Sequence, residues 1–312
     1  MIGPVIIPLD GSKLAEQAIA LGYSIAQRIN HDVLLLQVVE KEVNPILAHS
    51  DKDIHADELP DYATTQAKAY LQSIVEQLQI ADGSSVSYHV AFGRPGEQIA
   101  SVANEREASY VVMSTHGYTG LTRWMMGSVA DRVLHLTERP LVLIHPPHNV
   151  AYDRLDKQLE TLPDIKKIVV PLEGLPLAEQ ILPYVEQLAQ AYGQANIILF
   201  HAIPAFPAGL VPIQTAKLKQ EWLALSQEEA QTYLGNLVNT LRTQGHTVEF
   251  AIRVGMPAQE ILEYTKEVTA DLIMMTTHAR DGINRFLLGS VTSRVVQGGK
   301  IPVMVIRPTT SA

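Results

Sequence analysis

The chain of 312 residues is long enough for two domains of roughly 150 residues each. It is 46% hydrophobic and 18% charged, and its net charge of −9 argues against a protein that coats nucleic acid or an anionic membrane. Cysteine is absent, which excludes disulfides, thiolate catalysis and Cys-ligated metal centres.

No transmembrane segment is expected, because no apolar run reaches the roughly 18 residues that span a bilayer. The first residues, Met1 to Pro4, carry no basic stretch of the kind that opens a signal peptide. We therefore expect a cytoplasmic protein with neither membrane nor nucleic-acid partners.

The first half of the chain alternates strand patterns with helix patterns. Short, mainly apolar runs predict strands at 5–9, 33–39, 86–92, 110–113 and 141–144. Helices are predicted at 12–29, over a segment that ends near Leu78, from Pro95 onward, and at 128–136. Ser12 fits the N-cap of the first helix, and Pro95 fits the first turn of the third.

The second half repeats the first. The segment VIIPLDG at 5–11 returns as IVVPLEG at 168–174. Residues 93–145 align without gaps with residues 255–307, and 17 of these 53 positions are identical. A unit of domain size that occurs twice indicates a duplication rather than a solenoid.

This alternation predicts an α/β protein with two tandem, doubly wound, Rossmann-like domains, each built on a five-stranded parallel sheet. We place the domains at 1–147 and 162–312, with a polar linker at 148–161. Pro183 predicts a kink or a restart in the first helix of the second copy.

Candidate binding residues follow the first and fourth strands, because ligands of open α/β sheets bind outside the carboxyl ends of the strands. Asp10 follows the first strand and can accept hydrogen bonds from ribose hydroxyls. The segment after the fourth strand ends in Gly127-Ser128-Val129, where a helix begins. A glycine turn at a helix N-terminus presents free amides to phosphate.

With these residues, the chain resembles the universal stress protein family over nearly its whole length. The nucleotide-binding members of this family have an adenine nucleotide alpha hydrolase-like fold. Their sequences carry a motif that consists of Gly-x-x-Gly, nine further residues, and then Gly-Ser or Gly-Thr. Copy one has Ser114-Thr115-His116-Gly117, nine residues and Gly127-Ser128, so it departs only at Ser114. Copy two has Thr276-Thr277-His278-Ala279 before Gly289-Ser290, and both leading glycines are missing.

The resemblance implies a binding site for ATP, with Mg²⁺ as a possible companion ion. Asp10 and Ser114 would contact the ribose, and Val38 and Met113 the adenine. The phosphates would contact Gly117, Gly127, Ser128 and Val129. Pro8 would form the floor, and Ser12 would face the phosphates from the first loop. Apart from the resemblance, Arg123 is a basic residue within the phosphate-facing loop and is expected to screen the negative charge. The corresponding positions of copy two are Gly289, Ser290 and Val291.

Copy two is expected to bind nucleotide weakly or not at all. Glu173 replaces the first-strand aspartate and is one methylene longer, and Leu175 replaces Ser12 with an apolar side chain. Ala279 adds a methyl group where the backbone needs either a positive φ or a close approach to phosphate.

Three functions remain open at this point. The chain is a nucleotide-dependent stress-response or signalling module, a ligand-free interaction scaffold, or an ATP-using enzyme. No catalytic residue or metal site is predicted, although slow ATP hydrolysis stays open. His116 and His278 have no partner at a recognisable spacing and fit packed turn positions. The acidic, His-containing loop at 42–61 matches no metal-ligand spacing.

Assembly is also open. The fifth strands, at 141–144 and 303–306, are expected at sheet edges, which need covering. In the family that the chain resembles, these strands pair across a dimer. The resemblance therefore implies either that the tandem chain pairs them internally, as a pseudo-twofold monomer, or that a further homodimer forms through these edges; an unidentified protein partner is also expected.

Overall fold

The computed structural model describes residues 3–40, 59–82, 85–115, 126–145, 155–204, 216–277 and 289–308. Contacts within the chain divide it into two units, Met1–Pro163 (unit 1) and Asp164–Ala312 (unit 2). Both units are α/β, and all the strand pairs within each unit that the structure describes are parallel, which confirms the predicted fold class.

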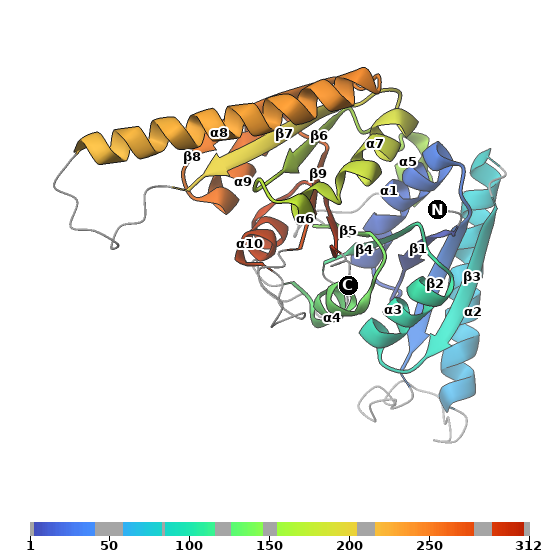
Figure 1. Ribbon diagram of the computed structural model, residues 1–312. Helices are drawn as coiled ribbons and strands as arrows, with labels where there is room; N and C mark the ends of the chain where they lie inside the picture. The colour runs from blue at the N-terminus through green and yellow to red at the C-terminus, as the bar shows by residue number, and fades with distance from the viewer. Residues whose placement is uncertain are drawn as a thin grey trace. The chain divides into compact units, whose positions relative to one another are not determined.

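Among the described residues, unit 1 has five strands, in the spatial order β3-β2-β1-β4-β5 (Figure 1). In chain order its elements are β1 (Val5–Pro8), α1 (Lys13–Ile29), β2 (Val33–Val39), α2 (Leu59–Asp82), β3 (Val86–Phe92), α3 (Pro95–Glu105), β4 (Tyr110–Ser114), α4 (Ser128–Leu136), β5 (Leu141–Ile144) and α5 (Leu155–Glu160). Right-handed crossovers place α1 and α2 on one face of this sheet and α3 and α4 on the other.

The strand order reverses between β1 and β4. The chain moves outward from β1 to β2 and β3, and then returns to the other side of β1 to form β4. The carboxyl ends of β1 and β4 therefore form a topological switch point, where such sheets bind ligands.

The core of unit 1 is formed by short strands that are buried on both faces. Every residue of β1 and β4 is buried, as expected for strands covered by helices on both sides. Gly22 of α1 allows this close packing, because a Cβ atom there would lie 2.7 Å from Cδ1 of Ile7.

Unit 2 repeats the arrangement in the order β8-β7-β6-β9-β10. Its elements are β6 (Lys167–Pro171), α6 (Pro176–Glu179), α7 (Leu182–Ala191), β7 (Asn196–Ile203), α8 (Ala216–Thr243), β8 (Val248–Val254), α9 (Pro257–Glu267), β9 (Leu272–Thr276), α10 (Ser290–Gly298) and β10 (Val303–Ile306). Two short helices, α6 and α7, stand where unit 1 has α1. Pro183 lies in the first turn of α7, where its missing N–H costs no helical hydrogen bond, so the break occurs where the sequence predicted it.

One helix differs in its bounds from the sequence prediction. Helix α2 begins at Leu59, inside the predicted loop, and continues to Asp82 beyond the predicted end near Leu78. The segment before β6 also packs on unit 1: Leu155 of α5 is buried, and the Ser24 hydroxyl donates a hydrogen bond to the Pro163 carbonyl at 2.7 Å.

Candidate functional site

A cavity of about 370 Å³ lies at the carboxyl ends of β1, β2 and β4 in unit 1. The residues that line it are Pro8, Leu9, Asp10, Ala15, Leu36, Val38, Glu40, Pro95, Ile99, Met113, Ser114, Thr115, Gly127, Ser128, Val129 and Ala130. Eight of the eleven residues predicted for the nucleotide site of copy one are among them: Pro8, Asp10, Val38, Met113, Ser114, Gly127, Ser128 and Val129.

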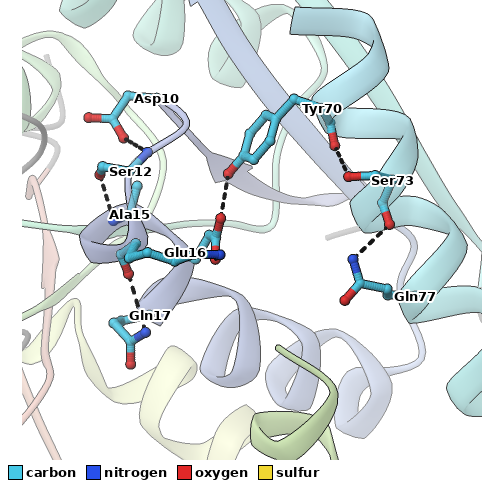
Figure 2. Close-up of polar contacts among 9 residues, drawn as sticks. Asp10, Ser12, Ala15, Glu16, Gln17, Tyr70, Ser73 and Gln77 are labelled. Atoms are coloured by element: carbon cyan, nitrogen blue, oxygen red, sulfur yellow. Dashed lines mark hydrogen bonds and ion pairs between the residues drawn. The ribbon is translucent and has the colours of Figure 1, made fainter. Parts of the chain in front are cut away.

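Asp10 lies in a tight turn between β1 and α1 (Figure 2). Its Oδ1 atom accepts a hydrogen bond from the Ser12 backbone N–H at 2.9 Å, and Gly11 between them has a φ of +82°. Such a φ favours glycine, because a Cβ atom is strained in that region. The turn holds an exposed carboxylate at the rim of the cavity.

Ser12 does not line the cavity. Its hydroxyl oxygen accepts a hydrogen bond from the Ala15 backbone N–H at 3.1 Å and so caps α1 (Figure 2). The structure therefore gives Ser12 the N-cap role that the sequence predicted for it.

The N-terminus of α4 opens onto the cavity. Gly127 is its N-cap residue and has no side chain, so the first amides of the helix receive no side-chain cap. The Gly127 N–H donates to the Thr115 carbonyl at 2.8 Å, which fixes this turn against the end of β4. Ser128, Val129 and Ala130 follow in the cavity wall. This end can bind an anion through backbone amides and the helix dipole.

The opposite part of the cavity is mainly apolar. Leu36 and Val38 alternate on β2, and Pro95 and Ile99 come from the first turns of α3. Glu40 follows directly after β2 and adds a second carboxylate to the wall. Sequence reasoning missed Leu36, Glu40 and Ile99 as site residues, although the strand after which Glu40 comes was predicted.

Two predicted site residues, Gly117 and Arg123, lie outside the described residues, as do His116, His278 and Ala279. The greater part of the acidic loop, residues 42–58, lies outside them as well. Within the parts of the chain that the structure describes, no group of three or more His, Asp or Glu side chains is placed to hold a metal ion.

The buried carboxylate of Glu16, in the first turn of α1, accepts a hydrogen bond from a tyrosine of α2. The Tyr70 hydroxyl donates to Glu16 at 3.3 Å, and the Lys13 ammonium lies 2.6 Å from the other Glu16 oxygen (Figure 2). The Glu16 side chain is only 6% exposed. Burial first, and then the Glu16 carboxylate, raise the pKa of Tyr70 well above its ordinary value, so the phenol stays a donor.

Unit 2 repeats this pair in a weaker form. Tyr233 and Glu179 stand 163 positions after Tyr70 and Glu16, and burial and Glu179 raise the pKa of Tyr233 in the same way. The buried Tyr233 hydroxyl, however, has no hydrogen-bond partner among the described residues. The shared spacing was visible in the sequence, but nothing there showed that the two side chains meet.

The cavity-forming positions of unit 2 carry different side chains on a similar backbone. Gly174 has a φ of +84° in the turn after β6, close to that of Gly11, while Glu173 and Leu175 replace Asp10 and Ser12. Leu175 stands at the N-cap of α6, makes no side-chain cap hydrogen bond and is 44% exposed. Gly289 is the N-cap of α10, so Ser290 and Val291 open that helix as predicted.

In unit 2, aromatic rings occupy the position that corresponds to the apolar part of the unit 1 cavity. The Leu172 N–H bonds the Phe200 carbonyl as the Leu9 N–H bonds that of Leu36, which makes Phe200 the counterpart of Leu36. Phe200 is fully buried, and its ring centroid lies 5.0 Å from that of Tyr264 on α9. The side chain at this position is therefore bulkier in unit 2 than the leucine of unit 1.

Comparison with known proteins assigns the chain to a family. The Universal stress protein family matches it twice, over residues 1–145 and 164–307. The chain belongs to the universal stress protein family. It contains the family's domain in tandem, which confirms the resemblance described above.

Individual universal stress proteins are similar to one half or to the whole of the chain. Universal stress protein MJ0531 of Methanocaldococcus jannaschii is 28% identical over 145 residues, which are 46% of this chain and 82% of that protein. Universal stress protein Rv2005c of Mycobacterium tuberculosis is 22% identical over 309 residues, 97% of this chain and 96% of that one.

A universal stress protein from Archaeoglobus fulgidus, solved by crystallography, covers 98% of this chain and 96% of its own, at 18% identity and a TM-score of 0.66. This structural similarity covers both tandem domains.

In the described part of the chain, no helix is long and apolar enough to cross a membrane.

Proposed function

We propose that unit 1 binds ATP or a related adenine nucleotide, and that the chain acts as a nucleotide-dependent stress-response or signalling module. The observation that carries this proposal is the meeting of four segments at one cavity: the ends of β1, β2 and β4 and the start of α4. They supply a carboxylate for the ribose hydroxyls, an apolar wall for the base, and uncapped amides for the phosphates.

Mg²⁺ would accompany the nucleotide through its phosphates, since this ion is commonly held by one or two carboxylates together with phosphate oxygens. The proposal assigns no fast catalysis to the site, and ATP turnover above about one per second would contradict that part of it.

Unit 2 is proposed to bind nucleotide weakly or not at all. Glu173 and Leu175 change the turn that in unit 1 presents Asp10, and the buried Phe200 of the Phe200–Tyr264 pair is bulkier than the leucine of unit 1. These differences add to the missing glycines of the motif in copy two.

The test begins with nucleotide carried by the purified protein, identified by chromatography of the supernatant after denaturation. Calorimetric titration of the stripped protein with ATP and Mg²⁺ then gives the stoichiometry. One nucleotide per chain supports the proposal, and two per chain contradict the inequality of the units. No carried nucleotide and no binding heat would favour the interaction scaffold instead.

A pair of matched variants tests the role of Asp10. Asp10→Asn removes a charge-assisted acceptor and is expected to weaken ATP binding about tenfold. Glu173→Gln makes the same chemical change at the counterpart position in unit 2 and is expected to leave the ATP affinity unchanged. Equal effects of the two variants would contradict the assignment to unit 1.

The proposed homodimer is tested separately. Light scattering gives the mass in solution, to be compared with the 34.3 kDa of one chain. A mass that stays at one chain over the accessible concentration range would remove the dimer from the proposal.

A further inference from the structure

The cavity of unit 1 lies at the ends of three neighbouring strands, and a different polar group stands near each of these ends. Glu40 follows β2, Asp10 follows β1, and Ser128 opens α4, whose first turn is tied to the end of β4 by the bond from Gly127 to Thr115. In the sheet these strands lie in the order β2-β1-β4. The amides of α4 and the Glu40 carboxylate are therefore separated by about two strand spacings, on the order of 10 Å.

The order of these strands determines where the phosphate, the sugar and the base of a bound nucleotide would lie. Among the described residues of the wall, we place a phosphate at the uncapped amides of α4, because α3 also begins at the wall but does so with Pro95, which has no N–H. The sugar then lies over β1 beside Asp10, and the base lies over β2. The side chains available to a base there are Leu36 and Val38 for its faces and Glu40 for its edge.

The position of Glu40 is set by the sheet. It comes immediately after the last residue of β2, Val39, whose carbonyl accepts a hydrogen bond from the Gly93 N–H at 3.1 Å. Leu36, Val38 and Glu40 are alternate residues, and side chains two apart in an extended chain share one face. Glu40 thus continues the row that lines the cavity, one step nearer its mouth, and it is exposed.

We infer that Glu40 selects the base, by accepting a hydrogen bond from the exocyclic 6-amino group of adenine and rejecting purines with a 6-oxo group. A carboxylate only accepts hydrogen bonds. At the 6 position an amino group can donate to it, whereas a 6-oxo group places a second acceptor at the same point and offers no donor there. Sites built to hydrogen-bond one group discriminate against analogues that lack it. This inference rests on the proposed nucleotide binding in unit 1.

The position of unit 2 that corresponds to Glu40 carries no carboxylate. Pro204 follows β7 as Glu40 follows β2, and the Gly255 N–H bonds the Ile203 carbonyl as the Gly93 N–H bonds that of Val39. The proline side chain offers no acceptor. At this position the acceptor is therefore present in unit 1 and replaced by proline in unit 2.

The experiment compares two ligands that differ at the 6 position of the purine. The stripped full-length protein is titrated with ATP and with inosine triphosphate, and the readout is the ratio of their dissociation constants. Since Glu40 is exposed and water competes for it, we expect the wild-type protein to prefer ATP by about tenfold rather than by a larger factor. In Glu40→Ala the ratio is expected to approach one.

Removing a negative charge also changes the affinity of an anionic ligand, but it does so equally for the two nucleotides and cancels in the ratio. Glu76→Ala on α2, outside the cavity, is the matched control and is expected to keep the wild-type ratio. Circular dichroism of each variant confirms folding.

Two results would overturn the inference in distinguishable ways. If ATP binds the wild-type protein and the ratio is near one, or is unchanged in Glu40→Ala, Glu40 does not select the base while the proposed function stands. If neither nucleotide binds the wild-type protein, the proposed function fails and the selection falls with it.

Discussion

The Tyr70–Glu16 pair and its counterpart in unit 2 allow one substitution to be made twice in the same chain. Tyr70→Phe removes the hydroxyl that donates to a buried carboxylate at 3.3 Å. Tyr233→Phe removes a buried hydroxyl that has no hydrogen-bond partner among the described residues. The two changes delete the same atom from the same kind of helix, so they differ only in what that atom contacts.

The magnitude of each effect follows from these contacts. A hydrogen bond to a charged group contributes roughly 1.5–3 kcal/mol to stability. The Tyr70–Glu16 distance is longer than the usual range for O–H···O bonds, and Glu16 keeps Lys13 at 2.6 Å. We therefore expect Tyr70→Phe to destabilise unit 1 by about 1–1.5 kcal/mol. Tyr233→Phe removes no hydrogen bond and takes away a buried donor that has no partner among the described residues, so it is expected not to destabilise unit 2.

Hydrogen exchange measured by mass spectrometry suits this comparison, because it reports each unit separately within the intact chain. Peptides from α1 and α2 are expected to exchange at least about fivefold faster in Tyr70→Phe, which corresponds to a loss of roughly 1 kcal/mol. Peptides from α7 and α8 are expected to keep their rates in Tyr233→Phe. Equal acceleration by both variants, or none by Tyr70→Phe, would refute this account of the pair.

Three further outcomes are expected from other contacts. Ser12→Ala removes the N-cap of α1 and should cost unit 1 about 1 kcal/mol in urea unfolding, with at most a small change in ATP affinity; a large loss of affinity at unchanged stability would restore Ser12 to the binding site. Gly22→Ala should destabilise unit 1 by about 1 kcal/mol, because the new methyl group meets the Ile7 side chain. Gly235→Ala in α8 meets no atom within 4 Å and should stabilise unit 2 by roughly 0.5–1 kcal/mol in the same assay, so opposite signs are the check.

The sequence predicted well the features that depend on short, contiguous runs of residues. The buried strands are short apolar runs, and the duplication appears as a repeat at nearly constant spacing. Asp10 and Gly127 could be chosen because they stand at the ends of such runs, where parallel sheets bind ligands. Ser12 was assigned two roles, and the structure supports its role as a cap.

The features that the sequence did not predict depend on which segments meet. Ile99 belongs to a predicted helix, but only the crossover from β3 to β4 brings that residue to the ends of β1 and β2. Glu40 stands between a predicted strand and a polar loop, where a solvated carboxylate is the simpler expectation. The Tyr70–Glu16 bond joins residues 54 positions apart, and no local pattern encodes such a distance.

The turns after β1 and β6 have nearly the same backbone, with φ values of +82° and +84° at Gly11 and Gly174. The chemical difference between them is therefore carried by the side chains on either side of the glycine. A duplicated protein built in this way can change the ligand of one copy by point substitutions, without rebuilding a loop and without loss of folding. One copy of the domain can keep the original activity while the other copy acquires a different activity.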